Sequence, residues 1–193
     1  MKKNILSVFV AIVAALISVA TVNAQSQFNK GDFALNLDYG FGYFDSWDFD
    51  GDGSYSTAQH SVGLMGEYGI MNVINSKGTI AVGGQIGAGF GSDGDVDLRR
   101  FRIATRGALH YSFIPQIDTY AGLTFCFVDI NKWKYEYTAV DGKKYKNDDT
   151  NARFIFPTLF AGARYMVSDA FGFNVETSWD RFACIAVGVS FKF

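Results

Sequence analysis

Three aspartates at alternating positions form the first group of residues whose types and spacing suit a definite chemistry. Asp48, Asp50 and Asp52 are followed by Gly53, which matches the first half of a calcium-binding loop. Carboxylates at this spacing converge on one hard cation, and the glycine allows the sharp turn of such a loop. The twelfth position, however, is Gln59 instead of a bidentate Glu, and the flanking patterns are those of strands. We therefore expect a solvated acidic loop, with calcium binding by residues 45–59 as the open alternative.

The second group consists of ionisable side chains that fall among glycines, alanines and serines instead of in polar loops. These residues are Asp38, Glu67, Arg102, Arg106, Arg164 and Glu176. Charges in poorly solvated surroundings are stable only when opposite signs pair. The six residues lie far apart in the sequence, so the elements that carry them must bring them together.

Those elements are predicted to be strands, because large apolar residues alternate with small or polar ones at a period of two. Beyond residue 24 the chain has no apolar run of 18 residues, so we expect no membrane helix there. The alternation defines eight segments: 33–43, 60–70, 79–90, 100–113, 119–128, 153–166, 171–179 and 182–193.

The two faces of these predicted strands differ in a way that indicates their surroundings. One face is large and apolar, and the other carries small residues and the charges named above. A lipocalin-like soluble barrel would hold its bulky apolar side chains inside and its charges outside. Small residues and paired charges suit a narrow lumen, and the bulky face then points at lipid.

Segment lengths and connections support a membrane barrel. The segments have about 10–13 residues, and a tilted membrane strand needs roughly 9–11. Short connections at 72–77, 114–118 and 167–170 alternate with longer polar ones at 45–59, 91–99 and 129–152, as periplasmic turns alternate with outer loops. Aromatic residues fall at both strand ends, in two belts: Tyr68, Tyr111, Tyr165 and Phe171 on the periplasmic side, and Tyr43, Phe90, Phe127 and Trp179 on the outer side.

Length and composition exclude several other classes of protein. A chain of 193 residues with 17% aromatics predicts one folded domain. A net charge of −2 gives no basic footprint for a nucleic acid. The two cysteines, Cys126 and Cys184, fall on strands that are not neighbours, so we expect buried free thiols and no disulfide.

The first 24 residues have the pattern of a cleaved signal peptide. Lys2 and Lys3 precede an uncharged apolar stretch at 5–22, and Val22-Asn23-Ala24 supplies a small-residue cleavage site. No positive cluster follows the stretch, which favours cleavage over a membrane anchor. We expect residues 1–24 to be a signal peptide and residues 25–193 to be a single barrel domain.

The C-terminal part carries a family resemblance. Gly162-Ala163-Arg164-Tyr165, Phe171-Gly172-Phe173 and the alternating tail that ends at Phe193 resemble the closing strands of small outer-membrane β-barrel proteins, of the outer-membrane protein A/X type. The resemblance implies an all-β, eight-stranded antiparallel up-and-down barrel in the outer membrane. It also implies assembly by the barrel-assembly machinery, which reads a similar terminal Phe. Outer-membrane lipid and lipopolysaccharide are the partners expected, the protein is expected to be a monomer, and no cofactor or metal is expected.

In a barrel of eight strands the interior is filled by side chains. We therefore expect the six charged residues to form a salt-bridged plug, with a narrow small-solute pore as the alternative. Pro157 interrupts the pattern, because Phe154 and Phe156 carry the apolar face before it and Leu159 carries it after it. A β-bulge at Pro157 would explain this change and would turn Arg164 inward.

One pair of residues raises the possibility of an enzyme. Outer-membrane lipid A deacylases use a His-x-Ser pair similar to His110 and Ser112, facing lipid and assisted by a Glu. Here the alternation turns both side chains inward, near the periplasmic turn, and no Glu is near in sequence. We expect a lumen histidine that is satisfied by polar neighbours.

The segment after the fifth strand predicts a hairpin above the outer surface. Trp133, Tyr135 and Tyr137 continue the odd-numbered face, and Asp141-Gly142 is a tight-turn signal. Lysines interleaved with aromatics could engage lipopolysaccharide phosphates or an acidic partner. The hairpin residues concerned are Lys132, Trp133, Lys134, Tyr135, Tyr137, Lys143, Lys144, Tyr145 and Lys146.

Together these features favour a non-enzymatic outer-membrane barrel with a structural or surface-interaction role. A lipid-modifying enzyme or a narrow pore is the alternative.

Overall fold

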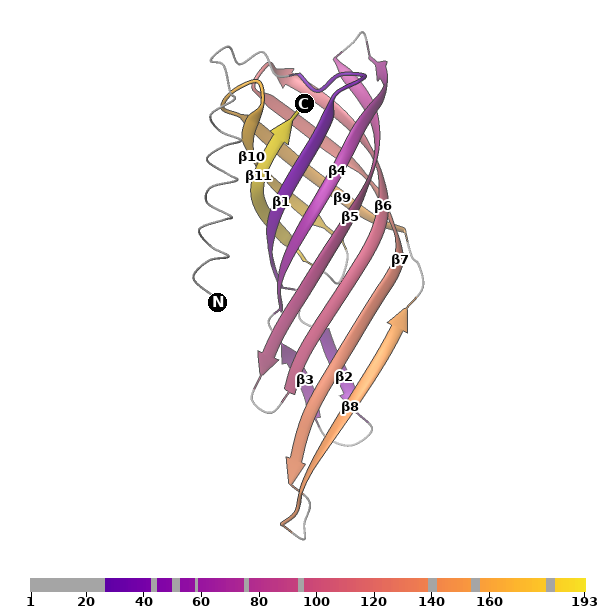
Figure 1. The fold of residues 1–193 in the computed structure, drawn as a ribbon, viewed down its shortest axis with the longest axis vertical. Coiled ribbons are helices and arrows are strands. Elements are labelled where there is room, and N and C mark those ends of the chain that lie inside the picture. Colours follow the sequence, from indigo (N-terminus) through magenta and orange to yellow (C-terminus); the bar gives the residue numbers. More distant parts are fainter. Residues whose placement is uncertain are drawn as a thin grey trace.

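The computed structural model describes residues 27–42, 45–49, 53–57, 59–74, 77–93, 96–138, 142–153, 157–179 and 183–193. Eight strands form a closed antiparallel barrel in which each strand pairs with its neighbours along the chain, and the last pairs with the first (Figure 1). The predicted all-β, eight-stranded up-and-down barrel is confirmed. Its strands are β1 (Phe33–Phe41), β4 (Gln59–Val73), β5 (Gly78–Asp93), β6 (Val96–Ile114), β7 (Ile117–Thr138), β9 (Pro157–Met166), β10 (Phe171–Ser178) and β11 (Ile185–Lys192).

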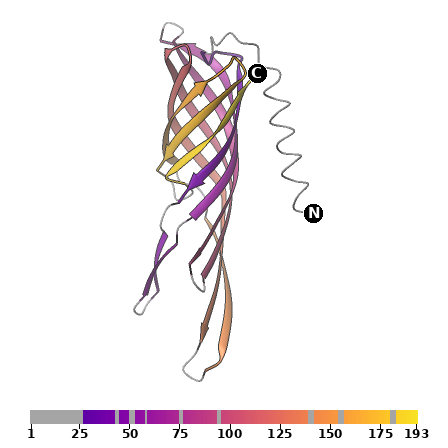
Figure 2. The same cartoon turned by 90° about the vertical axis from the view of Figure 1, so that its left-hand side faces the viewer.

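The two ends of the barrel differ. Short connections around residues 74–77, 115–116 and 167–170 lie at one end, here called the turn end. At the opposite end, the loop end, β2 (Asp45–Phe49) pairs with β3 (Gly53–Thr57), and β8 (Lys144–Arg153) pairs with the extended part of β7. Figure 2 shows these two hairpins as separate arms below the barrel. The carboxylate positions of the possible calcium loop include residues 50–52, which lie outside the described residues.

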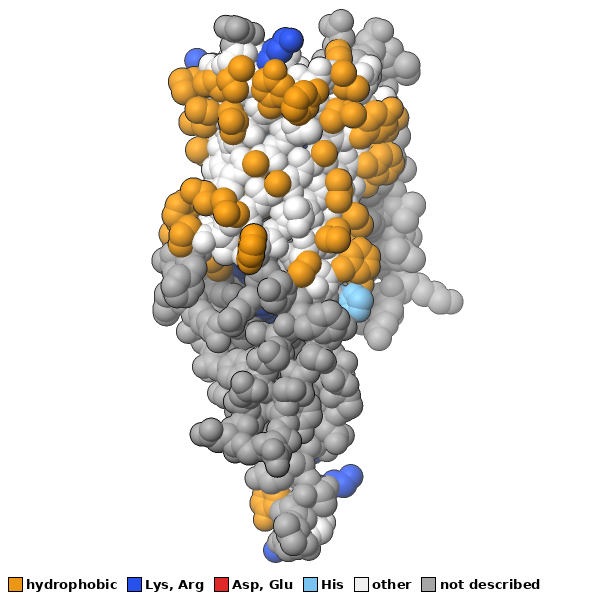
Figure 3. All heavy atoms as spheres, turned by 180° about the vertical axis from the view of Figure 1, so that it is seen from behind, with side chains coloured by type: hydrophobic (Ala, Val, Ile, Leu, Met, Phe, Trp, Pro, Cys, Tyr) orange, Lys and Arg blue, Asp and Glu red, His pale blue; other side chains and the backbone are white. Residues whose placement is uncertain are grey.

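The alternation of the sequence becomes an alternation between lumen and outer surface. Even-numbered residues of β6 from Arg100 to Ser112 are buried, while Phe101, Ile103 and Leu109 are exposed. On the face shown in Figure 3, hydrophobic side chains gather in two bands around the barrel, with few charged side chains between them. This is the distribution expected of a barrel whose outer surface contacts lipid. No helix in the described part of the chain is long and apolar enough to cross a membrane.

The predicted bulge at Pro157 is wrong. Asp129 pairs with Arg153 and Phe125 pairs with Pro157, so the register of β7 is the same on both sides of the proline. Pro157 is the first residue of β9, a position where the missing N–H is tolerated. Arg164 nevertheless points inward as predicted, because even-numbered residues face the lumen throughout β9. Phe154 and Phe156, which suggested the bulge, lie outside the described residues.

A bulge occurs instead in β7. Ile103 pairs with Val128 and Ala104 pairs with Cys126, which leaves Phe127 without a partner on β6. The extra residue moves the following even-numbered residues onto the outer face. Lys132 accordingly pairs with Arg99, and both are exposed. The prediction that the odd-numbered outer face continues through residues 133–137 is therefore wrong.

Cys126 and Cys184 are not joined in a disulfide. Cys126 is buried on β7 as expected, whereas the expectation that Cys184 is buried is wrong, since it is half-buried just before β11. The strands β7 and β11 are separated by β9 and β10 in the barrel, so the two cysteines have no shared edge on which to meet.

Candidate functional site

Arg106 is the centre of the first part of a buried charge cluster in the lumen. Its Nε lies 2.9 Å from Oε1 of Glu67, and its Nη2 lies 2.9 Å from Oε2 of Glu176. The Nη1 group donates to Oε1 of Glu176 at 3.2 Å and to Oε1 of Gln85 at 3.3 Å. The guanidinium carbon lies 3.7 Å from the centre of the Phe160 ring. One arginine thus joins β4, β5 and β10 across the lumen and stacks on an aromatic ring of β9.

Arg164 is the centre of the second part. Its Nη1 donates to Oδ2 of Asp118 at 3.0 Å, and its Nη2 lies 3.4 Å from Oε2 of Glu67. Nε donates to Oγ of Ser190 at 3.2 Å, and Nη2 also donates to Oδ1 of Asn36. The residue is 1% exposed. Glu67 bridges the two arginines, so both parts form one network.

His110 joins the same network. Its Nδ1 lies 2.8 Å from Oδ2 of Asp118, and its Nε2 lies 3.5 Å from Oε2 of Glu67. With Asp118 and Glu176 the cluster holds three carboxylates and two arginines, so a protonated imidazole makes it neutral overall. Buried charges are tolerated best when opposite signs balance and contact one another, as they would in this cluster.

Of the six predicted lumen residues, the structure brings four together: Glu67, Arg106, Arg164 and Glu176. Asp38 instead accepts a hydrogen bond of 2.6 Å from Nδ2 of Asn174. The side chain of Arg102 is buried nearer the loop end.

Asp118 belongs to the cluster but was not predicted. It falls in the predicted turn at 114–118, whereas β7 begins at Ile117. Even-numbered residues at the start of β7 face the lumen. If the predicted strand at 119–128 began two residues earlier, the same alternation would identify Asp118 as an inward residue.

The lumen has room for the cluster because glycines stand at two positions where other atoms lie too close for a Cβ. A Cβ at Gly162 would lie within 2.6–2.7 Å of the ring and hydroxyl of Tyr120, and a Cβ at Gly122 would collide with the backbone carbonyl of Gly107. Tyr120 in turn packs against Phe160 and His110. The small residues of the predicted inner face therefore allow bulky side chains from other strands to fill the lumen.

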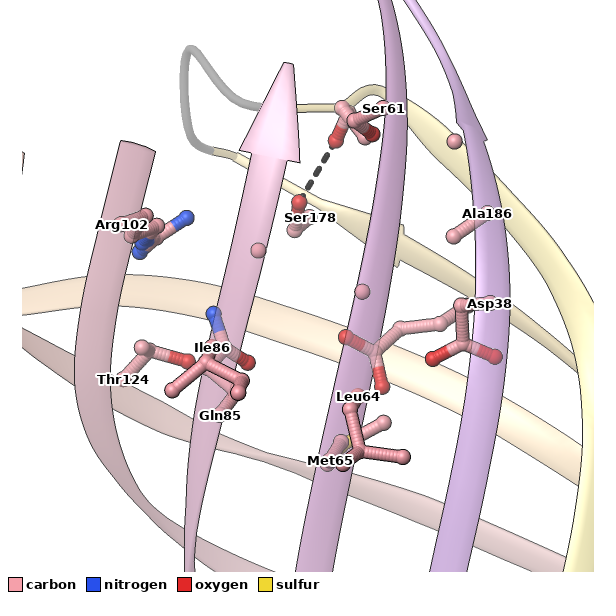
Figure 4. A pocket seen from close by; sticks show the side chains of 15 residues that line it. Asp38, Ser61, Leu64, Met65, Gln85, Ile86, Arg102, Thr124, Ser178 and Ala186 are labelled. Carbon is pink, nitrogen blue, oxygen red and sulfur yellow. Dashed lines mark hydrogen bonds between the residues drawn. The ribbon is translucent and has the colours of Figure 1, made fainter. Parts of the chain in front are cut away.

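Towards the loop end the lumen holds a cavity of about 60 Å³. Its lining combines apolar side chains such as Leu64, Met65 and Ile86 with polar and charged ones (Figure 4). The polar and charged ones include Asp38, Ser61, Gln85, Arg102 and Thr124, together with Glu176 of the cluster. The lumen is therefore filled at the turn end and hollow, on the scale of one or two water molecules, towards the loop end.

His110 and Ser112 both face the lumen and are buried, as predicted. The prediction that no Glu is available holds only along the sequence, since Glu67 lies beside His110 in space. The barrel wall separates the pair from the apolar outer surface. Among the described residues, no group of three or more His, Cys, Asp and Glu side chains is arranged to hold a metal ion.

The predicted hairpin is present as a pair of strands. Residues 129–138 of β7 pair with residues 144–153 of β8 in a continuous antiparallel register. Gly142, next to the turn, has a φ of 78°, a conformation that favours glycine. Lys132, Lys134, Lys144 and Lys146 fall on one face, because Lys134 pairs with Asp148 and Glu136 with Lys146. Trp133, Tyr135 and Tyr137 occupy the alternate positions of β7, and Tyr137 pairs with Tyr145. Lys143 directly precedes β8.

Comparisons with known proteins add structural neighbours. No family model and no curated protein sequence matches the chain. Two crystal structures of Ail, the attachment invasion locus protein of Yersinia pestis, are similar over 85% of this chain and 99% of Ail. The structure in complex with the heparin analogue sucrose octasulfate has 12% identity and a TM-score of 0.47, and the other has 13% and 0.49. The de novo designed TMB2.3, solved by solution NMR, has 21% identity and a TM-score of 0.41 over 86% of this chain and 98% of that one.

Proposed function

We propose that the protein is an integral outer-membrane barrel with a plugged, salt-bridged lumen and a structural or surface-interaction role. The observation that carries this proposal is the contrast between the two faces of one sheet. The interior holds a paired charge cluster, and the exterior carries exposed hydrophobic side chains along the strands. Such a surface is stable in hydrocarbon, and buried charges are tolerated where opposite signs pair as they do in this cluster.

The turn end then faces the periplasm and the loop end faces outward. Export would use the leader at residues 1–24, and the barrel-assembly machinery would insert the chain. Fractionation of cells that make the full chain, with N-terminal sequencing of the membrane-bound product, tests this. Outer-membrane protein that begins at Gln25 is expected. A product found in the inner membrane with its leader attached would contradict the proposal.

Planar-bilayer recording tests the closed lumen. Purified wild-type protein is expected to show no steady conductance in KCl. Steady open-channel current would contradict the plug and support the alternative of a narrow pore.

The enzyme alternative is tested separately, by mass spectrometry of lipid A from a deletion strain. Unchanged acylation is expected.

The surface role is proposed for the hairpin of β7 and β8. The bulge at Phe127 continues the outer face of the barrel into the exposed lysines Lys132 and Lys134, beside exposed Arg99 of β6. Lys132, Lys134 and Arg99 follow directly beyond the exposed hydrophobic side chains of β6 and β7. In a membrane, this places their charged ends at the level of the phosphate groups on outer-leaflet lipid. Lipopolysaccharide phosphates are therefore the partner proposed for this face.

Binding of lipopolysaccharide to the protein refolded in phospholipid vesicles tests this role. The double variant Lys132→Gln/Lys134→Gln is expected to bind about thirtyfold more weakly, since each lysine near a charged lipid surface contributes about 1 kcal/mol and two are removed. Lys77→Gln is the matched control, because Lys77 is exposed at the turn end. Equal binding by the double variant and the control would contradict the proposed partner.

A further inference from the structure

The segment before the first strand enters the mouth of the barrel at the turn end. Phe28 lies outside every strand, yet it is 2% exposed and packs with Ala34 of β1 and Ala81 of β5. Its ring centre lies 4.4 Å from that of His110 and 5.7 Å from the guanidinium carbon of Arg164. The ring therefore covers the charge cluster on the side that is open to the turn end.

Specific polar contacts hold this segment in place. The hydroxyl of Thr79 donates to the carbonyl of Phe28 at 2.7 Å, and the amide of Lys30 donates to Oδ1 of Asn72 at 2.7 Å. Nζ of Lys192 donates to the carbonyl of Gln27 at 3.1 Å. These contacts come from β4, β5 and β11, so the segment is attached to three strands of the barrel wall.

The chain is also shaped to turn from this segment into β1. Gly31 has a φ of 95°, and its amide donates to the carbonyl of Gly69 at 2.8 Å. The amide of Gly69 donates to the carbonyl of Asp32 at 3.0 Å. A Cβ at Gly69 would collide with the carbonyl of Asn29. Gly69 thus provides the space in which the segment lies, and the register of β4 on β5 shifts beside it, between Gly69 and Met71.

We propose that residues 27–32 are a stopper for the turn end of the lumen, and that withdrawal of this stopper opens a path for small ions through the barrel. The proposal rests on the closed lumen of the proposed function. Towards the loop end the lumen has a cavity, and between this cavity and the turn end lie the charge cluster, the rings of Tyr120 and Phe160 that pack on it, and Phe28. Without the ring, water reaches His110 and Arg164, the effective dielectric around the ion pairs rises, and the pairs weaken. The stopper is attached by one aromatic ring and a few hydrogen bonds outside the strand ladder, so it can leave while the barrel stays closed on itself.

Two substitutions release the stopper by different means. Phe28→Ala removes the ring that covers the cluster, and Gly69→Ala fills the space that Asn29 occupies. Each has a matched control. Phe33→Ala removes an exposed ring at the same end of the barrel, and Gly84→Ala adds a Cβ whose nearest neighbour is the carbonyl of Ala104 at 3.5 Å.

Planar-bilayer recording in KCl, together with hydrogen exchange of the Gly31 and Gly69 amides, tests the proposal. In wild-type protein and both controls we expect a closed lumen and protected amides. In Phe28→Ala and Gly69→Ala we expect the Gly31 and Gly69 amides to exchange fast. We also expect the lumen to conduct with an open probability about ten- to a hundredfold higher than in wild-type protein. This factor corresponds to the free energy gained by burial of one aromatic side chain. If Gly69→Ala fails to fold, Phe28→Ala still tests the proposal. Phe28 belongs to no barrel strand, so its substitution leaves the strand pairing of the barrel intact.

Equal conductance of wild-type protein and Phe28→Ala overturns the stopper, whether or not the amides exchange. That result leaves the closed lumen of the proposed function standing. Steady current from the wild-type protein contradicts the closed lumen itself, so the two failures are distinguishable.

Discussion

Nε of Arg106 lies 2.9 Å from Oε1 of Glu67 inside the lumen, and neither side chain is more than 1% exposed. The contact is an ion pair and not an aligned hydrogen bond, because neither atom has a hydrogen-bond partner. Its strength therefore depends on the absence of water and on the further carboxylate of Glu176.

Glu67→Gln is expected to destabilise the barrel by about 3–5 kcal/mol, because it leaves two buried guanidinium groups without their shared carboxylate. Arg106→Met is expected to cost a similar amount. The double variant is expected to lose clearly less than the sum of the two, since both partners of the pair are removed together. Urea unfolding in lipid vesicles, followed by tryptophan fluorescence, measures all three. Additive losses would show that the two residues do not interact.

The outer surface is expected to tolerate charge according to depth. Val175 lies in the middle of β10, and Val167 lies in the connection at the turn end, both exposed. Val175→Arg is expected to reduce the free energy of unfolding by about 2–4 kcal/mol, and Val167→Arg by about 0–1 kcal/mol. The same vesicle unfolding assay applies. Equal losses at both positions would contradict the placement of the hydrocarbon layer around the middle of the strands.

Both cysteines are expected to be labelled when the unfolded, unreduced protein is alkylated. In the folded protein, Cys184 is expected to react faster than Cys126, because Cys126 is buried in the lumen and Cys184 is half-buried beside β11. Mass spectrometry of the intact protein counts the labels, and Cys126→Ser assigns them. An unlabelled pair in the unfolded state would reveal a disulfide.

Amides of the hairpin beyond the barrel are expected to be protected from hydrogen exchange in detergent, because residues 129–138 and 144–153 form a continuous ladder. Gly142→Val is expected to remove this protection, since a β-branched residue is strained at a φ of 78°. Val96–Ile114 of β6 serves as the internal reference, because its barrel amides are expected to stay protected in the variant. If residues 132–146 exchange as fast as free peptide in the wild-type protein, the hairpin and its proposed lipopolysaccharide face are both wrong.

The parity of each strand was readable from the sequence, because a strand places alternate side chains on opposite faces without reference to any other part of the chain. That local rule predicted eight strands, an apolar exterior and the inward positions of Glu67, Arg106, Arg164 and Glu176. It also predicted that His110 would find polar partners in the lumen. Because opposite charges face the same narrow lumen, their pairing is the stable arrangement, and it could be predicted as well.

The tertiary structure decided the features that depend on how two strands are aligned with each other. The bulge at Phe127 exists only in the register between β6 and β7, and it reverses the faces of every residue beyond it. Pro157 needs no bulge, because it begins a strand whose register β7 already fixes. Phe28 belongs to no alternating pattern, and closure of the barrel alone places His110 beneath its ring. Inter-strand register and ring closure are long-range properties, so a period of two read along one segment does not contain them.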